Sequence, residues 1–110
     1  MSCLFCKIAA GEIPASVVHS SKRIVAFNDI DPQAPVHILV VPKDHHDNIA
    51  ALTSTDPQLA TELMTVAADI GAAHRDGFRI VLNTGTDGGQ SVNHVHAHVL
   101  AGRGLAWPPG

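Results

Sequence analysis

Residues 94–100 read His94-Val95-His96-Ala97-His98-Val99-Leu100, and this alternation of side chains is typical of a β-strand. Successive side chains of a strand point to opposite faces, so the three histidines share one face with Leu100 and the small apolar residues share the other. The apolar face can pack on a core, while the imidazoles stand in a row about 7 Å apart. Because imidazole can donate, accept, attack or bind metal near neutral pH, this strand, predicted over residues 92–100, is the main candidate for a functional site.

Apolar runs bounded by turn-forming residues predict four more strands. They lie at residues 17–19, 24–28, 37–41 and 78–83, and the first two form a hairpin. Two prolines predict a loop at residues 29–35, and three glycines predict another at residues 84–90. Leu4–Ala10 predicts a short helix that ends at Gly11.

One long helix is predicted from Leu59, Leu63, Val66 and Ile70, which recur with a helical period. Its start allows two interpretations, a capping box from Thr55 to Gln58, or Asp56 as the cap with Pro57 in the first position. The helix should end near residue 74. The whole pattern predicts an α+β fold with a mostly antiparallel five-stranded sheet, one long helix and a short N-terminal helix.

Composition predicts one domain over residues 1–110, with 45% hydrophobic and 15% charged residues. The formal net charge is -3 and there is no run of basic residues, which argues against a nucleic acid partner. No apolar run reaches membrane-spanning length, so no membrane partner is expected. Two cysteines, Cys3 and Cys6, without a signal peptide predict reduced thiols and a cytoplasmic location.

The histidine row has two chemical interpretations and one that is merely structural. Two strand histidines can bind one metal, or one imidazole can attack while its neighbours orient it and move protons. A solvated polar face is the third, but such faces usually carry Lys, Glu or Thr. The glycine-rich segment 85–91 leads directly into the row, and its backbone N–H groups can converge on an anion.

Several segments together resemble the histidine triad superfamily over nearly the whole chain. The signature is His-φ-His-φ-His-φ-φ, where φ is apolar, and residues 94–100 match all seven positions. The other matching segments are Glu12-Ile13-Pro14, Phe27-Asn28-Asp29-Ile30, Pro32-Gln33-Ala34-Pro35, Val36–Lys43, Gly88-Gly89-Gln90-Ser91, Gly102-Arg103 and Trp107-Pro108-Pro109-Gly110. The last of these favours the purine nucleoside phosphoramidase branch, and the third histidine favours a hydrolase over the nucleotidyltransferase branch.

The resemblance implies hydrolysis of a phosphorus–nitrogen bond in a nucleoside 5′-phosphoramidate, such as adenosine 5′-monophosphoramidate or AMP-lysine. By motif position, His96 is the nucleophile that forms a nucleotidyl-histidine intermediate, and His98 contacts the phosphate and assists proton transfer. His94 supports the orientation of the nucleophile, His37 extends the imidazole network, and Ser91 meets the leaving group. A dinucleoside polyphosphate hydrolase and a nucleotide-binding adaptor with incidental hydrolysis are the alternatives.

The resemblance also implies a purine nucleotide (AMP or GMP type) as ligand. Its expected contacts are Ile13, Phe27, Asp29, Ile30, Asn83, Gly89, Gln90, Ser91, His96 and His98. Asp29 would hold the ribose hydroxyls, and the apolar members would form a slot for the base. Relatives are homodimers in which the C-terminal tail lies near the partner's site, and we expect the same here.

The Cys3-x-x-Cys6 motif allows a redox pair, two ordinary buried cysteines, or a structural metal site. The βαβ context of a thioredoxin-like motif is absent. Some bacterial histidine triad proteins carry such a pair, which implies a structural zinc bound by Cys3, Cys6, His45 and His94. No cofactor is expected to be required for catalysis. A zinc hydrolase that uses His94 and His96 together lacks an obvious third ligand.

Overall fold

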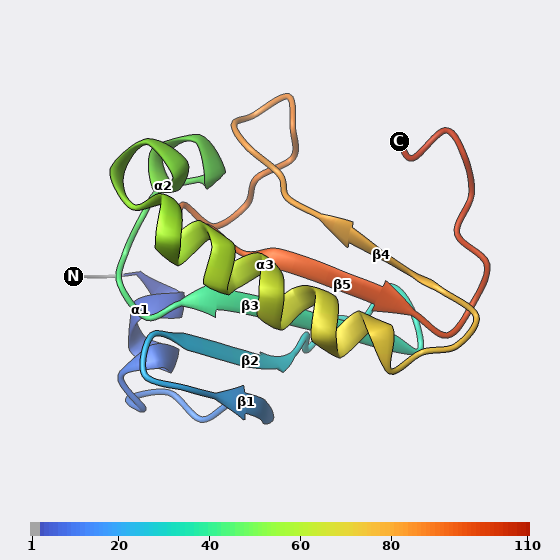
Figure 1. Cartoon of the computed structure of the whole chain (residues 1–110), viewed down its shortest axis with the longest axis horizontal. Coiled ribbons are helices and arrows are strands. Elements are labelled where there is room, and N and C mark those ends of the chain that lie inside the picture. Colours follow the sequence, from blue (N-terminus) through green and yellow to red (C-terminus); the bar gives the residue numbers. More distant parts are fainter. Residues whose placement is uncertain (1–2) are drawn as a thin grey trace.

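A five-stranded antiparallel sheet forms the centre of the computed structural model, which describes residues 3–110 (Figure 1). Its strands, in spatial order, are β1 (Val17–Ser20), β2 (Ile24–Asn28), β3 (Val36–Pro42), β5 (Ala97–Ala101) and β4 (Phe78–Val81). Each neighbouring pair is antiparallel, including the predicted β1–β2 hairpin. The predicted fold class is confirmed.

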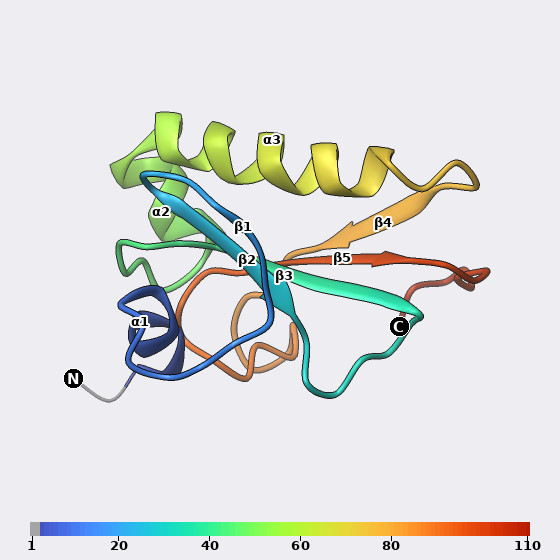
Figure 2. The ribbon, with the colours of Figure 1, turned by 90° about the horizontal axis from the view of Figure 1, so that it is seen from below.

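Within residues 3–110, three helices accompany the sheet: α1 (Leu4–Ala9), α2 (Ile49–Thr55) and α3 (Pro57–Ala72). Figure 2 shows α3 along one face of the sheet and α1 on the opposite side. The Asp56 side chain accepts a hydrogen bond from Leu59 N at 3.1 Å, with Pro57 in the first turn, so the second interpretation of the helix start is correct. α2 was not predicted; its start is marked by Asn48, whose side chain accepts from Ala51 N at 2.8 Å.

Apolar side chains fill both faces of the sheet because β2 and β3 are buried on both sides. The larger core lies between α3 and the sheet and consists of Ile24, Ala26, Ile38, Val40, Leu52, Leu59, Ala60, Leu63, Ala67, Val95, Ala97 and Val99. A smaller core on the opposite face consists of Phe5, Val25, Phe27, Leu39 and Val41. The predicted apolar face of the histidine segment, Val95, Ala97 and Val99, is therefore in the larger core.

The histidine strand is shorter than predicted, because β5 begins only at Ala97. Pairing with β3 runs from Val36–Ala101 to Val40–Ala97 and stops two residues before Pro42, which has no N–H to donate. The Pro42 carbonyl accepts from the His94 side chain at 2.8 Å, and Val95 N donates to His46 O instead. Two of the three histidines thus precede the strand. β4 also ends early, at Val81, because its partner His98 lies at the start of β5.

The helices of residues 3–110 include none that is both long and apolar enough to span a membrane.

Candidate active site

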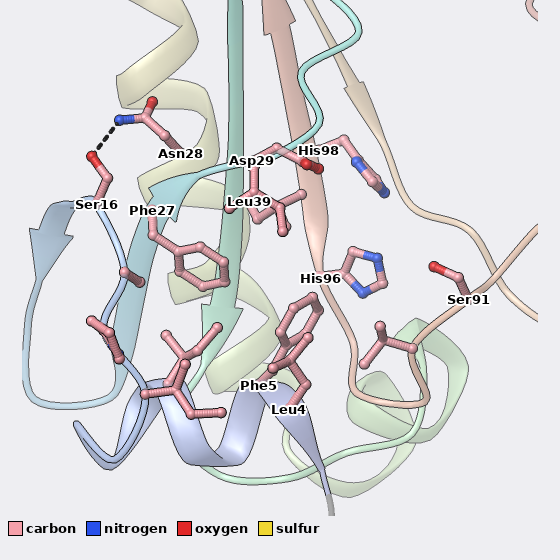
Figure 3. Close-up of a pocket in the computed structure, with 16 residues that line it drawn as sticks. Leu4, Phe5, Ser16, Phe27, Asn28, Asp29, Leu39, Ser91, His96 and His98 are labelled. Atoms are coloured by element: carbon pink, nitrogen blue, oxygen red, sulfur yellow. Dashed lines mark hydrogen bonds between the residues drawn. The ribbon is translucent and has the colours of Figure 1, made fainter.

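A cavity of about 520 Å³ opens on the α1 side of the sheet (Figure 3). Seven of the predicted nucleotide contacts line it: Ile13, Phe27, Asp29, Ile30, Ser91, His96 and His98. Sequence reasoning missed Leu4, Phe5 and Ile8 of α1, which form part of its wall. Their spacing on one side of the short helix was the available signal. The cavity is mainly apolar, and its polar side chains are one carboxylate, two hydroxyls, one amide and two imidazoles, from Asp29, Ser16, Ser91, Asn28, His96 and His98.

His96 presents an unprotonated nitrogen as a consequence of its main-chain contact. Its Nδ1 lies 2.8 Å from His94 O, and a carbonyl can only accept, so Nδ1 carries the proton and donates. The lone pair of the neutral ring is therefore on Nε2. Burial lowers the pKa of His96, which keeps the ring neutral and nucleophilic at pH 7. The Phe5 ring packs against it at a centroid distance of 5.0 Å.

In contrast to His96, His98 presents a protonated Nε2, because it is the last member of a hydrogen-bonded chain. Gln33 N donates to His37 Nδ1 at 3.0 Å, so the proton of neutral His37 is on Nε2, which donates to His98 Nδ1 at 2.9 Å. The N–H of His98 is then on Nε2, a buried atom without a hydrogen-bond partner among residues 3–110. Burial, together with the neighbouring His96 and His37, lowers the pKa of His98 to about 4. The cavity thus receives one lone pair from His96 and one N–H from His98.

Asp29 lies beside this chain and also lines the cavity. Its Oδ2 is 3.4 Å from His37 Nε2, while its Oδ1 accepts from Asp31 N at 2.8 Å. His37 itself is buried and does not line the cavity, so it contacts the site through His98 and Asp29.

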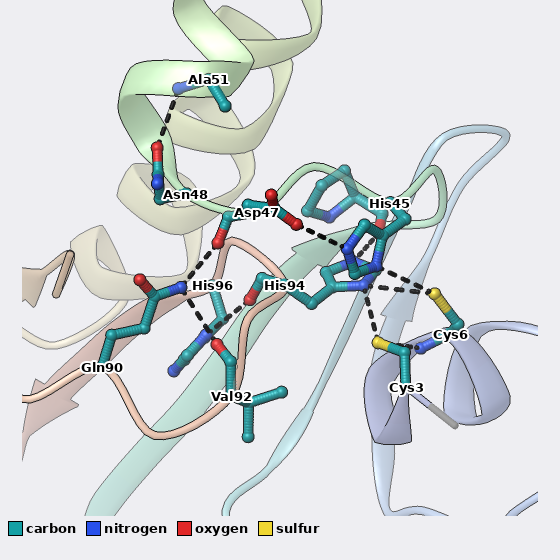
Figure 4. A network of polar contacts seen from close by, with 11 residues as sticks. Cys3, Cys6, His45, Asp47, Asn48, Ala51, Gln90, Val92, His94 and His96 are labelled. Carbon is teal, nitrogen blue, oxygen red and sulfur yellow. Dashed lines mark hydrogen bonds and ion pairs between the residues drawn. The ribbon is translucent and has the colours of Figure 1, made fainter. Parts of the chain in front are cut away.

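The glycine-rich loop lies next to the cavity but supplies only Ser91 to its lining. Asn83, Gly89 and Gln90 do not line it. The Gln90 side chain serves the protein itself, since its Nε2 donates to Asp47 O at 2.6 Å and to Val92 O at 3.0 Å, and its Oε1 accepts from Gly85 N at 3.1 Å. Gln90 therefore ties the loop to the segment that follows β3 (Figure 4).

Cys3, Cys6, His45 and His94 form a compact cluster whose ligand atoms all lie within 4.8 Å of one another (Figure 4). His94 Nδ1 is 3.3 Å from Cys3 Sγ and 3.5 Å from Cys6 Sγ, and His45 Nδ1 is 3.3 Å from Cys6 Sγ. His94 Nε2 donates to Pro42 O and His45 Nε2 donates to Asp47 Oδ1 at 2.9 Å. In the neutral form of each ring the proton is thus on Nε2, and the unprotonated Nδ1 faces the sulfurs, as metal ligation requires.

Two thiolates and two imidazoles are a standard closed ligand set for zinc, with no position left for substrate. The cluster and the cavity use different histidines, since His94 does not line the cavity. The free Nδ1 of His94 faces the cysteines, whereas the Nδ1 of His96 is used in the bond to His94 O and its free nitrogen is Nε2 in the cavity, which disfavours a shared catalytic metal. The residues present fit a structural metal.

Comparison with known proteins gives consistent matches along the chain. A family model described as HIT domain matches residues 10–105. An uncharacterised HIT-like protein of Synechococcus elongatus is 46% identical over 109 residues, which cover 97% of this chain and 96% of that protein. The structure of a HIT family hydrolase from Legionella pneumophila matches with a TM-score of 0.94 at 46% identity, covering 99% of this chain and 100% of that one. A histidine triad protein from Clostridium difficile matches with a TM-score of 0.90 at 44% identity, covering 96% and 95%.

Proposed function

Since the chain belongs to the HIT domain family, we propose that it is a hydrolase that binds a purine nucleotide and cleaves the phosphorus–nitrogen bond of nucleoside 5′-phosphoramidates. The observation that carries this proposal is the pairing of a lone pair on His96 Nε2 with an N–H on His98 Nε2 in one cavity. A nucleophile beside a fixed donor is what displacement at a phosphorus with charged oxygens needs.

In the first step, His96 Nε2 attacks the α-phosphorus, the phosphorus–nitrogen bond breaks, and the nucleotide is held on His96. The leaving amine takes the bonding pair and needs a proton. In the second step, water attacks the same phosphorus and gives its proton to the chain of His98 and His37, and the phosphorus–His96 bond breaks to release the nucleotide and neutral His96. The His98 N–H stabilises charge on the phosphate oxygens in both steps.

The hydrogen-bonded chain behind His98 supplies a route for the proton. Neutral His98 and His37 cannot release a proton without becoming anions, so this chain must first take up one proton from solvent. His98 Nε2 then gives a proton to the leaving amine, and the chain, joined by the 2.9 Å contact between His37 Nε2 and His98 Nδ1, returns to its neutral state. Asp29, 3.4 Å from His37 Nε2, stabilises the transient positive charge. The low pKa of His98 makes the protonated form a minor but strongly acidic one at pH 7.

The remaining lining supports a nucleoside. Ile13, Phe27 and Ile30 offer an apolar surface for a base, and the Asp29 carboxylate can accept from ribose hydroxyls. Ser91 lies at the entrance of the histidine segment, where its hydroxyl can contact the leaving group. Cys3 and Cys6 form no disulfide, which agrees with the reducing conditions of the proposed cytoplasmic location.

Trapping of the intermediate tests this proposal. Protein mixed with adenosine 5′-phosphoramidate and quenched in base should gain the mass of AMP on a peptide containing His96, and His96→Gly should gain none. Full turnover by His96→Gly would contradict the proposal. Faster hydrolysis of a dinucleoside polyphosphate than of the phosphoramidate would favour that alternative substrate, and nucleotide binding without turnover would favour an adaptor.

We also propose a structural zinc at Cys3, Cys6, His45 and His94, supported by the ligand set and its tautomers. Purified protein should contain one zinc per chain by elemental analysis, and the double variant Cys3→Ser, Cys6→Ser should contain none. Unchanged zinc content in the double variant would exclude the site. The serine variant His74→Ser, of a histidine outside the cluster, is the matched control.

A homodimer is proposed as the functional form. A hollow on the outer side of α2 and α3 is lined by apolar residues, including Ile49, Ala60, Met64 and Leu82, and a second copy can cover it. Trp107 in the C-terminal tail is 82% exposed and can reach a partner's site. Sedimentation should give the mass of a dimer, and Met64→Lys should give a monomer, whereas Val18→Lys on β1 should leave the dimer intact. A monomeric wild-type protein would contradict this.

A further inference from the structure

α1 belongs to both the metal cluster and the cavity. Cys3 caps the helix and Cys6 lies one turn later, while Leu4, Phe5 and Ile8 of the same helix line the cavity. A helix of six residues has no stability of its own in water, so its position depends on tertiary contacts. Phe5 is its buried residue, and the two cysteines are its polar anchor.

The Phe5 ring lies between the elements that would bind the two ligands. It packs edge-on against His94 of the metal cluster at 6.0 Å, against His96 at 5.0 Å, and against Phe27 of the cavity wall at 5.6 Å. The cysteines stand on either side of it in the sequence. A force that moves Cys3 and Cys6 therefore also moves the ring that packs on the nucleophile and on the cavity wall.

Two other contacts connect the same sites. The His94 main-chain carbonyl accepts from His96 Nδ1, so the residue that offers Nδ1 to the metal also fixes the tautomer of the nucleophile. On the other side, His45 donates to Asp47, whose carbonyl accepts from the Gln90 side chain (Figure 4). Gln90 Oε1 in turn accepts from Gly85 N and so holds the glycine-rich loop. The cluster thus contacts the cavity wall, the nucleophile and the loop.

From these contacts we propose that metal binding at the cluster and nucleotide binding in the cavity are positively coupled through α1, so that each ligand raises the affinity of the other. The inference rests on the proposed nucleotide and zinc binding. Metal holds both cysteines and both imidazoles at fixed distances, which places Leu4, Phe5 and Ile8 in the conformation that receives a base. By linkage, the nucleotide must stabilise the metal-bound arrangement by the same factor.

Calorimetry with AMP, on zinc-loaded protein and on protein stripped with a chelator, tests whether bound zinc raises the affinity for AMP. We expect the dissociation constant of AMP to rise by at least about fivefold on stripping, the lower end of typical coupling factors. Competition against a chromophoric chelator then gives zinc affinity with and without saturating AMP, with a protein-free blank for zinc bound by AMP itself. The factor by which zinc raises the affinity for AMP should equal the factor by which AMP raises the affinity for zinc.

Phe5→Leu tests the route, because it keeps both cysteines and the helix but removes the aromatic edge contacts. Zinc affinity without nucleotide should stay near that of the wild type, and the coupling factor should fall towards one. Phe78→Leu, the same change on β4 away from α1, is the matched control and should retain the wild-type factor.

The outcomes separate the coupling from the proposals beneath it. Equal AMP affinity in zinc-loaded and stripped protein, both with native far-UV circular dichroism, overturns the coupling alone. Loss of the native spectrum on stripping also overturns it, since the linkage would then run through global folding and not through α1. No AMP binding in either form refutes nucleotide binding itself, and no zinc uptake refutes the metal site.

Discussion

At the scale of single residues, the three histidines of one motif differ because each ring meets a different hydrogen-bond partner. His96 donates to a carbonyl through Nδ1, and His94 donates to a carbonyl through Nε2. His98 accepts at Nδ1 from His37, whose own tautomer is set by the N–H of Gln33. Identical side chains thereby present a lone pair to the cavity, a lone pair to the cysteines, and an N–H to the cavity.

His37→Leu tests this assignment. The change removes the donor to His98 Nδ1 and leaves a buried acceptor unsatisfied, at a cost of roughly 1–3 kcal/mol. We expect kcat/KM for the phosphoramidate to fall about tenfold to hundredfold. Nitrogen-15 chemical shifts should also show His98 losing its single tautomer, which a merely structural defect would not cause.

Gln33→Ala is the control, because its main-chain N–H still reaches His37 Nδ1 and only the side-chain bond to Asp31 O is lost. Its activity and His98 tautomer should match those of the wild type. A His37→Leu protein with the original His98 tautomer would contradict the chain.

Local sequence pattern could place these histidines on one side but could not divide them between two sites. Their alternation with Val95 and Ala97 predicts that the histidines share one face of the strand and that the apolar residues share the other. The second half of this prediction is confirmed, because Val95 and Ala97 lie in the larger core. The direction of His94 depends on Cys3, 91 positions away, and on Pro42, 52 positions away. Phe5 was missed as a cavity residue because its partners likewise come from distant segments.

At the scale of elements, the strongest local signals were those with a periodic pattern or a cap. α3 has both, a stripe with a helical period and Asp56 at its start. α2 has seven residues and buries only Leu52, too few for a period to be visible. The histidine strand was predicted too long because the partner that ends its ladder, Pro42, lies far away in the sequence.

Asp56→Ala should destabilise the protein by about 1–2 kcal/mol, which urea unfolding measures as a lower midpoint. The carboxylate caps α3 through Leu59 N and also contacts the Arg23 guanidinium, which lowers the pKa of Asp56. Thr55→Ala changes the alternative cap residue one position earlier and should shift the midpoint little. Equal midpoints for the two variants would contradict Asp56 as the cap.

At the scale of the whole molecule, the larger hydrophobic core and the candidate active site lie on opposite faces of the sheet. Figure 2 shows α3 on one face of the sheet and α1 on the other. The larger core lies on the α3 face, and the cavity, which α1, His96 and His98 line, lies on the α1 face. Burial on the active face keeps the pKa values of His94, His96 and His98 below the ordinary value of histidine. The buried imidazoles are therefore harder to protonate in the folded protein than in the unfolded chain. As a consequence, the free energy of unfolding should depend on pH.

The sign follows from His98, whose pKa is about 4 in the folded state and about 6.5 when unfolded. Between these values the unfolded chain binds more protons than the folded one, so the free energy of unfolding falls as the pH falls from about 6.5 towards 4. Above pH 6.5 this group adds no pH dependence. Urea unfolding at pH 7, 6 and 5, with excess chelator throughout so that metal loss plays no part, should show this decline.

The variant His98→Gln should show a smaller decline, whatever its stability at pH 7, because it lacks one imidazole that titrates in this pH range only when the chain is unfolded. An equally steep decline in the variant would show that the buried imidazole of His98 is not a source of the acid sensitivity.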